Sequence, residues 1–181
     1  MKPFLGPTVR QVLVMIILGI DPGTAITGYG VLETRQGKQC LLGYGVIETS
    51  ADMRMESRLC MIHEKLKSII EIYQPDEMAI EQLFFHRNNK TVITVAQSRG
   101  VLIMTAASAG LEIAEYTPLQ VKQAVCGYGK ADKKQVQFMV QNILTLPKPP
   151  KPDDAADAIA IALCHSQSRR LNLFAKDRGF I

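Results

Sequence analysis

The sequence has no cysteine pair with the spacing of a zinc site. Its four cysteines, Cys40, Cys60, Cys126 and Cys164, stand far apart, and no C-x-x-C motif or Cys/His cluster occurs. This scattering favours reduced thiols that pack inside the protein, as in a cytoplasmic chain, over a disulfide framework or a structural metal.

A hydrophobic run long enough to cross a membrane is also missing. The strongest candidate, residues 12–20, is too short for a span and continues into "DPGT" without the small-residue cleavage site of a signal peptide. A buried strand explains it better, so we expect a cytoplasmic protein with no membrane association. Because Met15 could itself serve as a start, we expect residues 1–14 to be an N-terminal extension outside the folded domain.

A strong excess of charge of either sign is absent as well. The 181 residues are 47% hydrophobic and 21% charged, with a formal net charge of +4. These values are ordinary for a soluble globular protein, and the chain is long enough to bury a substantial core as one domain. The mild basic excess is only a weak indication of an anionic partner.

The hydrophobic pattern predicts an α/β domain. Residues 14–20 form a continuous apolar run, typical of a strand buried on both faces, and two further strands at 27–34 and 39–49 flank a turn. Strands at 77–82 and 111–116 then alternate with helices. The helices are expected at 54–74, 90–110, 118–127, 131–146 and 153–166. This order predicts a mixed five-stranded sheet, with an antiparallel meander followed by parallel strands, flanked by helices. We expect the domain to span residues 15–168 and a basic C-terminal tail to occupy 169–181.

Four acidic residues stand at the edges of apolar segments. Asp21 follows the most hydrophobic strand, Glu81 ends the strand at 77–82, and Asp154 and Asp157 share one face of the last helix. An unpaired carboxylate beside apolar residues is costly, so convergence on shared cations is an economical explanation. Oxygen ligands favour Mg²⁺, with Mn²⁺ as a substitute. Four acids can hold two such ions roughly 3.5–4 Å apart, the spacing used in two-metal phosphoryl transfer.

Each of these acids also has an ordinary structural explanation. Asp21 could begin a turn, Glu81 could be an exposed acid at a strand end, and Asp157 could face solvent. Asp153, directly after Pro152, is best explained as a cap or first-turn acid that the helix dipole favours. The joint occurrence of the other acids favours a shared site over separate coincidences.

Four stretches, which follow one another in the region from Met15 to about His165, carry a shared pattern: "ILGIDPGTAITGYGV", "AIEQLFF", "GYGKADKKQVQFMV" and "PKPDDAADAIAIA". Together they resemble the RuvC family of bacterial Holliday-junction resolvases. This resemblance implies a ribonuclease-H-like fold in which the first and fourth strands are neighbours. It also implies a homodimer that makes paired nicks in a four-way DNA junction and leaves 5′-phosphates. The RuvA–RuvB branch-migration complex is the partner that the family implies.

The same resemblance implies residue roles. Asp21, Glu81, Asp154 and Asp157 correspond to the catalytic, metal-binding acids of the family. Phe84 corresponds to the aromatic residue that interacts with junction bases, and Lys122 and Lys133 correspond to lysines that contact DNA.

Basic residues around these motifs extend the expected DNA surface. Residues 119–151 hold several lysines and a single acid, which suits contact with a phosphate backbone, although a solvated helix face is the common alternative. We therefore expect Lys130 and Lys134 to contact DNA together with Lys133. Arg87 is expected to do so from the loop that carries Phe84, where an exposed aromatic ring can stack on a base. Phe85 is the alternative for that ring.

Other functions fit parts of the sequence. A ribonuclease H or transposase-type nuclease would share the fold but cut a different substrate, such as an RNA–DNA hybrid. A junction-binding module without catalysis would not need the four acids. The segment "GIDPGT" also resembles the phosphate loop of actin-like ATPases, but those proteins need two related domains, for which 181 residues are too few.

Overall fold

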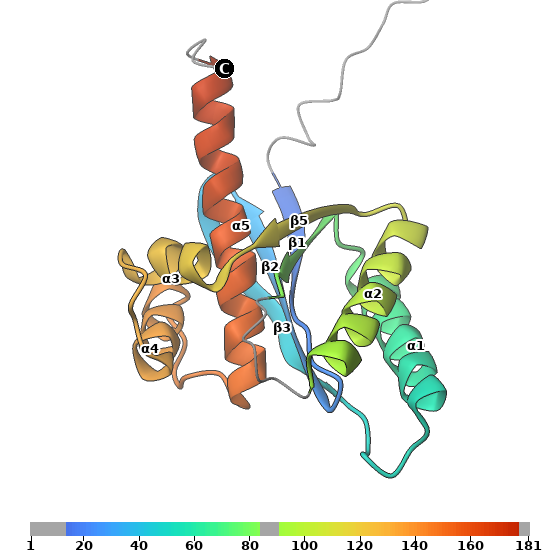
Figure 1. The fold of residues 1–181 in the computed structure, drawn as a ribbon. Coiled ribbons are helices and arrows are strands. Elements are labelled where there is room, and N and C mark those ends of the chain that lie inside the picture. The colour runs from blue at the N-terminus through green and yellow to red at the C-terminus, as the bar shows by residue number, and fades with distance from the viewer. Residues whose placement is uncertain (1–13, 84–90, 178–181) are drawn as a thin grey trace, which may run out of the picture.

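Helices cover both faces of a five-stranded sheet in the computed structural model of the chain (Figure 1). The structure describes residues 14–83 and 91–177, with side chains up to residue 170. The strands are β1 (Val14–Asp21), β2 (Ile26–Arg35), β3 (Lys38–Glu48), β4 (Glu77–Glu81) and β5 (Glu112–Tyr116). The helices are α1 (Met55–Tyr73), α2 (Val92–Ser108), α3 (Pro118–Cys126), α4 (Lys133–Ile143) and α5 (Asp153–Asp177). This element order confirms the predicted fold class.

The sheet combines antiparallel and parallel pairing in the order β3-β2-β1-β4-β5. The first three strands form the antiparallel meander, whereas β1 and β4, and β4 and β5, run parallel. Ile20 of β1 is paired with Ile80 of β4. The first and fourth strands are therefore neighbours, as the resemblance implied, and their carboxyl ends lie at the same edge of the sheet.

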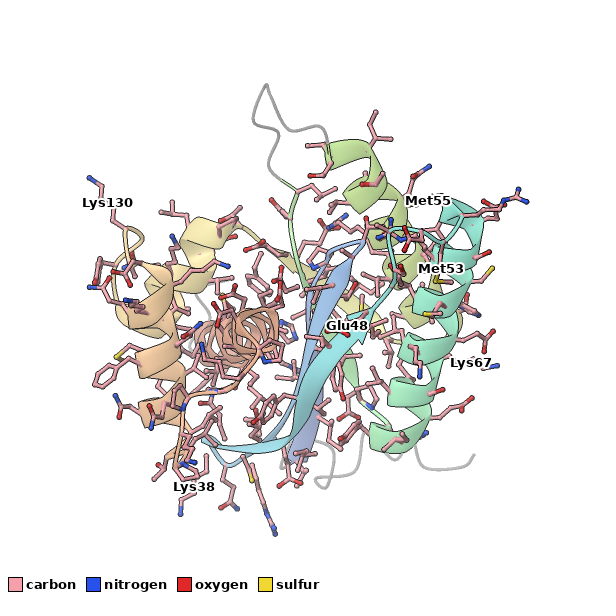
Figure 2. All side chains as sticks on the ribbon, turned by 90° about the horizontal axis from the view of Figure 1, so that it is seen from below. Lys38, Glu48, Met53, Met55, Lys67 and Lys130 are labelled. Atoms are coloured by element: carbon pink, nitrogen blue, oxygen red, sulfur yellow. The ribbon has the colours of Figure 1, made fainter. Side chains whose placement is uncertain are left out.

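The sheet separates two hydrophobic layers (Figure 2). Successive residues of a strand point to opposite faces, and Ile17 and Leu18 of β1 belong to different clusters, both with no exposed surface. Leu18 packs with residues of α1 and α2, whereas Ile17 packs with residues of α3, α4 and α5. Burial on both faces explains why β1 is a continuous apolar run.

Helix α5 lies directly on β1 and β2 because glycines face it. A Cβ atom at Gly28 would overlap the carbonyl oxygen of Asp154, and one at Gly19 would overlap the carbonyl oxygen of Ala158. Small residues on both sides allow the two backbones to approach more closely than larger side chains would permit. The start of α5 is thereby fixed against the end of β1, since Gly28 is paired with Asp21.

Helix α5 continues without a break to Asp177. It therefore passes through most of the segment that the sequence analysis set apart as a basic tail from residue 169. Where this continuation begins, Arg169 Nη1 lies 3.1 Å from Glu77 Oε1 at the start of β4, so α5 is still anchored to the sheet there. Neither α5 nor another helix in the described ranges is long and apolar enough to cross a membrane.

A buried polar network holds α5 to β4 and β5. His165 Nε2 lies 2.5 Å from Glu77 Oε2, and the Tyr116 hydroxyl lies 2.8 Å from His165 Nδ1. The hydrogen bond from His165 lowers the pKa of Glu77, burial opposes this effect, and the Arg169 charge adds to it. Glu77 thus serves as the anionic centre of the network.

We predict that Glu77→Gln lowers the free energy of unfolding by about 2 kcal/mol near neutral pH, because it removes the charge that His165 and Arg169 contact. Folding lowers the pKa of Glu77. The stabilisation is therefore present above the unfolded pKa of about 4.3 and is lost as pH falls through the folded pKa. Urea unfolding of both proteins across this pH range measures the difference.

The exposed Glu112→Gln variant on β5 is the matched control, and it should change stability by less than about 0.5 kcal/mol. Equal losses in both variants, or a Glu77→Gln loss that does not narrow at acidic pH, would contradict the role of Glu77.

Candidate functional site

Asp21 ends β1 and precedes a tightly bonded loop. The Thr27 hydroxyl donates to the Gly23 carbonyl oxygen at 2.6 Å. The Thr49 hydroxyl donates to the Thr24 carbonyl oxygen, also at 2.6 Å. These bonds hold the backbone that follows Asp21, so the turn expected here also fixes the position of the acid.

Glu81 ends β4, and its side chain reaches the same pocket as that of Asp21. The parallel pairing of Ile20 with Ile80 places the two acids side by side at the sheet edge. The pocket has a volume of about 270 Å³. Its polar lining consists of three acids and two lysines, namely Asp21, Glu81, Asp157, Lys122 and Lys133. Its apolar wall comes from α3, α4 and α5.

The first two turns of α5 bring the other two acids to this edge. Asp154 lies in the first turn, where its backbone contacts Gly28. Asp157 follows one turn later on the same face and lines the pocket. The structure therefore brings together the acids that sequence reasoning selected, from β1, β4 and α5.

Burial and repulsion between carboxylates raise the pKa values of Asp21, Glu81 and Asp157. Burial is the largest cause for Asp21, followed by the charges of Glu81, Asp157 and Asp154, and together they raise the pKa of Asp21 to about 8. Burial and then the charge of Asp157 raise the pKa of Glu81 to about 7. Burial also raises the pKa of Asp157. The site therefore disfavours the fully ionised set of acids unless positive charge is supplied.

Lys133 supplies part of that positive charge. Its Nζ lies 3.2 Å from Asp157 Oδ2, and the charge of Asp157 raises the pKa of Lys133. Lys133 also opposes the rise in the pKa values of Asp21 and Glu81, and Lys122 does so for Glu81. An acidic centre is thus bordered by ammonium groups from α3 and α4.

The donors of the site suit a hard divalent cation. All of the converging acids offer carboxylate oxygens, the ligand type that Mg²⁺ and Mn²⁺ take. Within residues 14–83 and 91–170, no three acidic, histidine or cysteine side chains already lie close enough to enclose an ion. Drawing the carboxylates together must overcome their repulsion, and the charge of a bound cation provides the compensating attraction.

The remaining predicted residues are placed as follows. Asp153 is a first-turn acid of α5, as expected, and its Oδ1 lies 2.8 Å from Lys151 Nζ. Lys130 and Lys134 are exposed, before and within the first turn of α4. Phe84, its alternative Phe85 and Arg87 lie outside the described residues.

Sequence reasoning missed two contributions to the site. It assigned Lys133 to DNA contact but did not foresee its ion pair with Asp157, which depends on how α4 packs beside α5. It also gave no role to α2, although Arg99 Nε donates to the Glu81 carbonyl oxygen at 3.0 Å. No local pattern marks Arg99, because its partners are distant in sequence.

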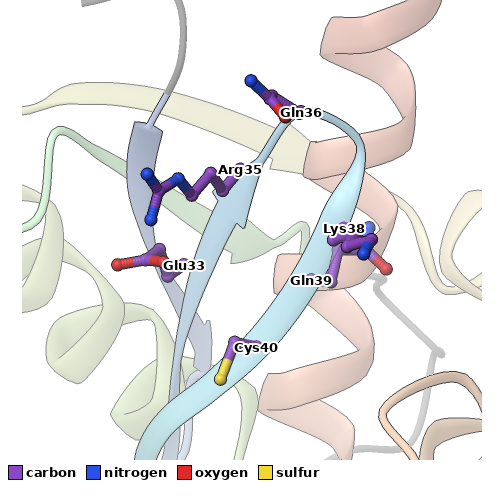
Figure 3. A pocket seen from close by; sticks show the side chains of 6 residues that line it. All are labelled: Glu33, Arg35, Gln36, Lys38, Gln39 and Cys40. Atoms are coloured by element: carbon purple, nitrogen blue, oxygen red, sulfur yellow. The ribbon is translucent and has the colours of Figure 1, made fainter. Parts of the chain in front are cut away.

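A larger hollow of about 480 Å³ lies elsewhere, at the tip of the β2–β3 hairpin (Figure 3). Its lining residues are Glu33, Arg35, Gln36, Lys38, Gln39 and Cys40. These side chains are spread around the tip and do not converge on one point. It stands at the end of β1 away from Asp21, since Arg35 is paired with Val14, and it is therefore separate from the acidic pocket.

Comparison with known proteins finds one family that matches most of the chain. A family model described as "Crossover junction endodeoxyribonuclease RuvC" matches residues 17–165, a range that includes all four acids. A protein of that name from Syntrophomonas wolfei is 58% identical over 160 residues, which are 88% of this chain and 93% of that protein.

Two solved structures extend the similarity to three dimensions. The Thermus thermophilus RuvC structure aligns with a TM-score of 0.80 at 37% identity, covering 87% of this chain and 97% of that one. A structure of T. thermophilus RuvC in complex with a Holliday junction substrate aligns with a TM-score of 0.83 at 36% identity. It covers 87% of this chain and 96% of that one.

We predict that Asp21→Asn stabilises the metal-free protein by about 2 kcal/mol near pH 8. Folding raises the pKa of Asp21 from 3.8 to about 8. Its ionised form is therefore disfavoured in the folded state, and wild-type stability should decline as pH rises through this interval. Thermal and urea unfolding in EDTA, from about pH 4 to pH 8, measure the effect.

The exposed Asp52→Asn variant provides the comparison for this experiment. If Asp21→Asn unfolds like Asp52→Asn at every pH, the four acids do not repel one another in the way that the structure indicates.

Proposed function

The chain belongs to the RuvC family of crossover junction endodeoxyribonucleases, and from this membership we infer that it is a structure-specific nuclease that cuts four-way (Holliday) DNA junctions. The main structural support for nuclease chemistry is that acids from β1, β4 and α5 lie in one pocket that two lysines border. Lysines attract a phosphodiester, and carboxylates hold the cations that phosphoryl transfer uses. Junction cutting serves homologous recombination and DNA repair.

We propose Asp21, Glu81, Asp154 and Asp157 as the catalytic acids and as the ligands of two Mg²⁺ ions, for which Mn²⁺ can substitute. Bound there, the ions would activate a water molecule and neutralise charge on the leaving 3′ oxygen, which yields 5′-phosphate ends. Support comes from the oxygen-only donor set and from the raised pKa values of Asp21 and Glu81, since both features call for added positive charge.

The protein's own groups prepare the site for this reaction. Asp21 and Glu81 must lose their protons when they bind a cation, so cation binding should release protons near neutral pH. Lys133 forms an ion pair with Asp157, and the charge of Lys122 opposes the rise in the pKa of Glu81. Among the described residues that line the pocket, none is Ser, Thr, Cys or Tyr. This composition supports direct attack by water, without a covalent enzyme intermediate.

The DNA surface is proposed to extend from the pocket along α4. Lys130 and Lys134 are exposed beside Lys133, so their ammonium groups are accessible to a DNA backbone. Lys122 is proposed as a contact on α3. Phe84 and Arg87 complete the proposed set on the basis of the family resemblance.

We propose that two copies of the chain act together, because a four-way junction is resolved by cutting two opposed strands and each copy holds one acidic pocket. Helix α2 offers a surface for the second copy. Ile93 and Met104 are 74% and 51% exposed and lie about three turns apart on one face. Between them, a Cβ atom added at Gly100 would point into open space. Family membership also supports the RuvA–RuvB branch-migration complex as a partner.

We predict that the wild-type protein with Mg²⁺ nicks two opposed strands of a synthetic four-way junction and leaves a linear duplex intact. Asp21→Asn should slow nicking about a hundredfold or more, because a lost metal ligand removes several kcal/mol of transition-state stabilisation, whereas Asp52→Asn should cut normally. Single-turnover cleavage of end-labelled junctions, followed by ligation of the products, measures the nicking rate and shows whether the ends carry 5′-phosphates.

Two outcomes would contradict this prediction. Cutting of an RNA–DNA hybrid alone would instead support a ribonuclease H, and tight junction binding without nicking would support a non-catalytic module.

For the second copy, we predict that Ile93→Glu with Met104→Glu shifts the protein from dimer to monomer, because charged side chains would have to be buried in the contact. Analytical ultracentrifugation at micromolar concentration measures this. Ile72→Glu is the control, since Ile72 is equally exposed, at 71%, but lies on α1. A dimer that persists in the α2 variant and dissociates in the α1 variant would place the contact on α1.

A further inference from the structure

Helix α2 forms hydrogen bonds at the carboxyl ends of both β1 and β4, the strands that carry Asp21 and Glu81. Two consecutive residues make these contacts. Ser98, which has no exposed surface, places its hydroxyl 3.0 Å from Thr24 Oγ1 in the loop after Asp21. Arg99 donates from Nε to the carbonyl oxygen of Glu81. One turn of α2 therefore contacts the carboxyl ends of both β1 and β4.

Arg99 provides a donor where the sheet can no longer do so. The parallel ladder between β1 and β4 ends at Ile20 and Ile80. Two residues beyond Ile20 stands Pro22, which has no N–H to donate to β4. On its other side, β4 still pairs, because the Gln82 N–H donates to the Tyr116 carbonyl oxygen at 2.8 Å. On the β1 side of β4, the carbonyl oxygen of Glu81 accepts its hydrogen bond from Arg99 Nε.

The guanidinium of Arg99 is itself held in place. Its Nη2 lies 2.6 Å from Glu115 Oε2 of β5, and its side chain is only 14% exposed. A planar guanidinium can bind two acceptors in fixed directions at once. The orientation in which Arg99 meets Glu81 is thus set by β5 as well as by α2.

We propose that Arg99 is a positioning residue for metal binding: by fixing the backbone of Glu81, it aims the Glu81 carboxylate at Asp21 and so prepares the cation site. The proposal rests on the proposed function and deepens it. Arg99 acts through the main chain, since the charges that act on the Glu81 carboxylate come from Asp157, Lys133 and Lys122. A group that orients a metal ligand typically changes metal affinity or activity by about 10- to 100-fold when removed.

A purely structural role is the alternative, in which Arg99 only attaches α2 to the sheet. Helix α2 has other anchors for that purpose, because Leu102 and Ala106 are fully buried in the core with α1. The Thr105 hydroxyl also lies 2.8 Å from His63 Nδ1 of α1. A structural role would show as lost stability with unchanged metal affinity, whereas a positioning role would show as weakened metal binding in a folded protein.

The test compares Arg99→Met, Arg99→Lys and Glu115→Gln with the control Arg54→Met, whose guanidinium is exposed at the start of α1. Calorimetric titration with Mn²⁺ in the absence of DNA gives metal affinity. We expect affinity to fall about tenfold or more in Arg99→Met. Smaller losses are expected in Arg99→Lys, which keeps a donor, and in Glu115→Gln, which keeps the guanidinium. Arg54→Met should bind like the wild type.

A second measurement separates positioning from substrate binding. Junction affinity measured without metal should stay within about twofold of wild type in Arg99→Met, while the single-turnover nicking rate falls by the same factor as metal affinity. Wild-type Mn²⁺ affinity in a folded Arg99→Met would overturn the proposal. If Arg99→Met does not fold, the Mn²⁺ affinity of Glu115→Gln tests the positioning role in its place. An unchanged Mn²⁺ affinity in Glu115→Gln would then overturn the proposal as well. A wild-type protein that binds Mn²⁺ but nicks no junction would refute the proposed function, while the Mn²⁺ titrations would still decide the role of Arg99.

Discussion

The close contact between α5 and the glycines of β1 and β2 is the constraint on which the site depends. Gly19 and Gly28 let the helix backbone lie directly on the sheet. Because Gly28 is paired with Asp21, this contact brings Asp154 to the end of β1, and the helical period then presents Asp157 to the same pocket. The Glu77–His165–Arg169 network holds the other half of α5, so the helix is fixed at both ends of the sheet.

This packing gathers acids that repel one another. The protein offsets part of that repulsion with Lys133 and Lys122, and leaves the rest as raised pKa values at Asp21 and Glu81. Such an arrangement is poor for stability and good for binding cations, a balance common at catalytic sites. We propose that the same lysines also contact the phosphate backbone of the substrate, so that one set of charges would serve both the acids and the DNA.

Much of the fold follows from local patterns in the sequence. The apolar run of β1, the hairpin around Gly37 and the alternation of later strands and helices all carry short-range signals, and the structure has them in the predicted order. The four acids could be selected because each stands at the edge of an apolar segment. Contacts between distant segments could not be predicted in this way: the ion pair of Lys133 with Asp157 and the bond from Arg99 to Glu81 depend on helix packing. The ion pair between Arg169 and Glu77, where α5 continues past the predicted domain boundary, also joins residues that are far apart in sequence.

The central claim is that Asp21, Glu81, Asp154 and Asp157 together form the cation site of a junction-cutting nuclease. Anomalous diffraction from crystals of the protein soaked in Mn²⁺ tests it most directly, because the scattering locates each ion relative to named side chains. The account predicts Mn²⁺ bound by carboxylate oxygens of these four residues at the shared edge of β1, β4 and α5. Mn²⁺ found only at other residues, in a protein that still nicks junctions under the same conditions, would contradict it.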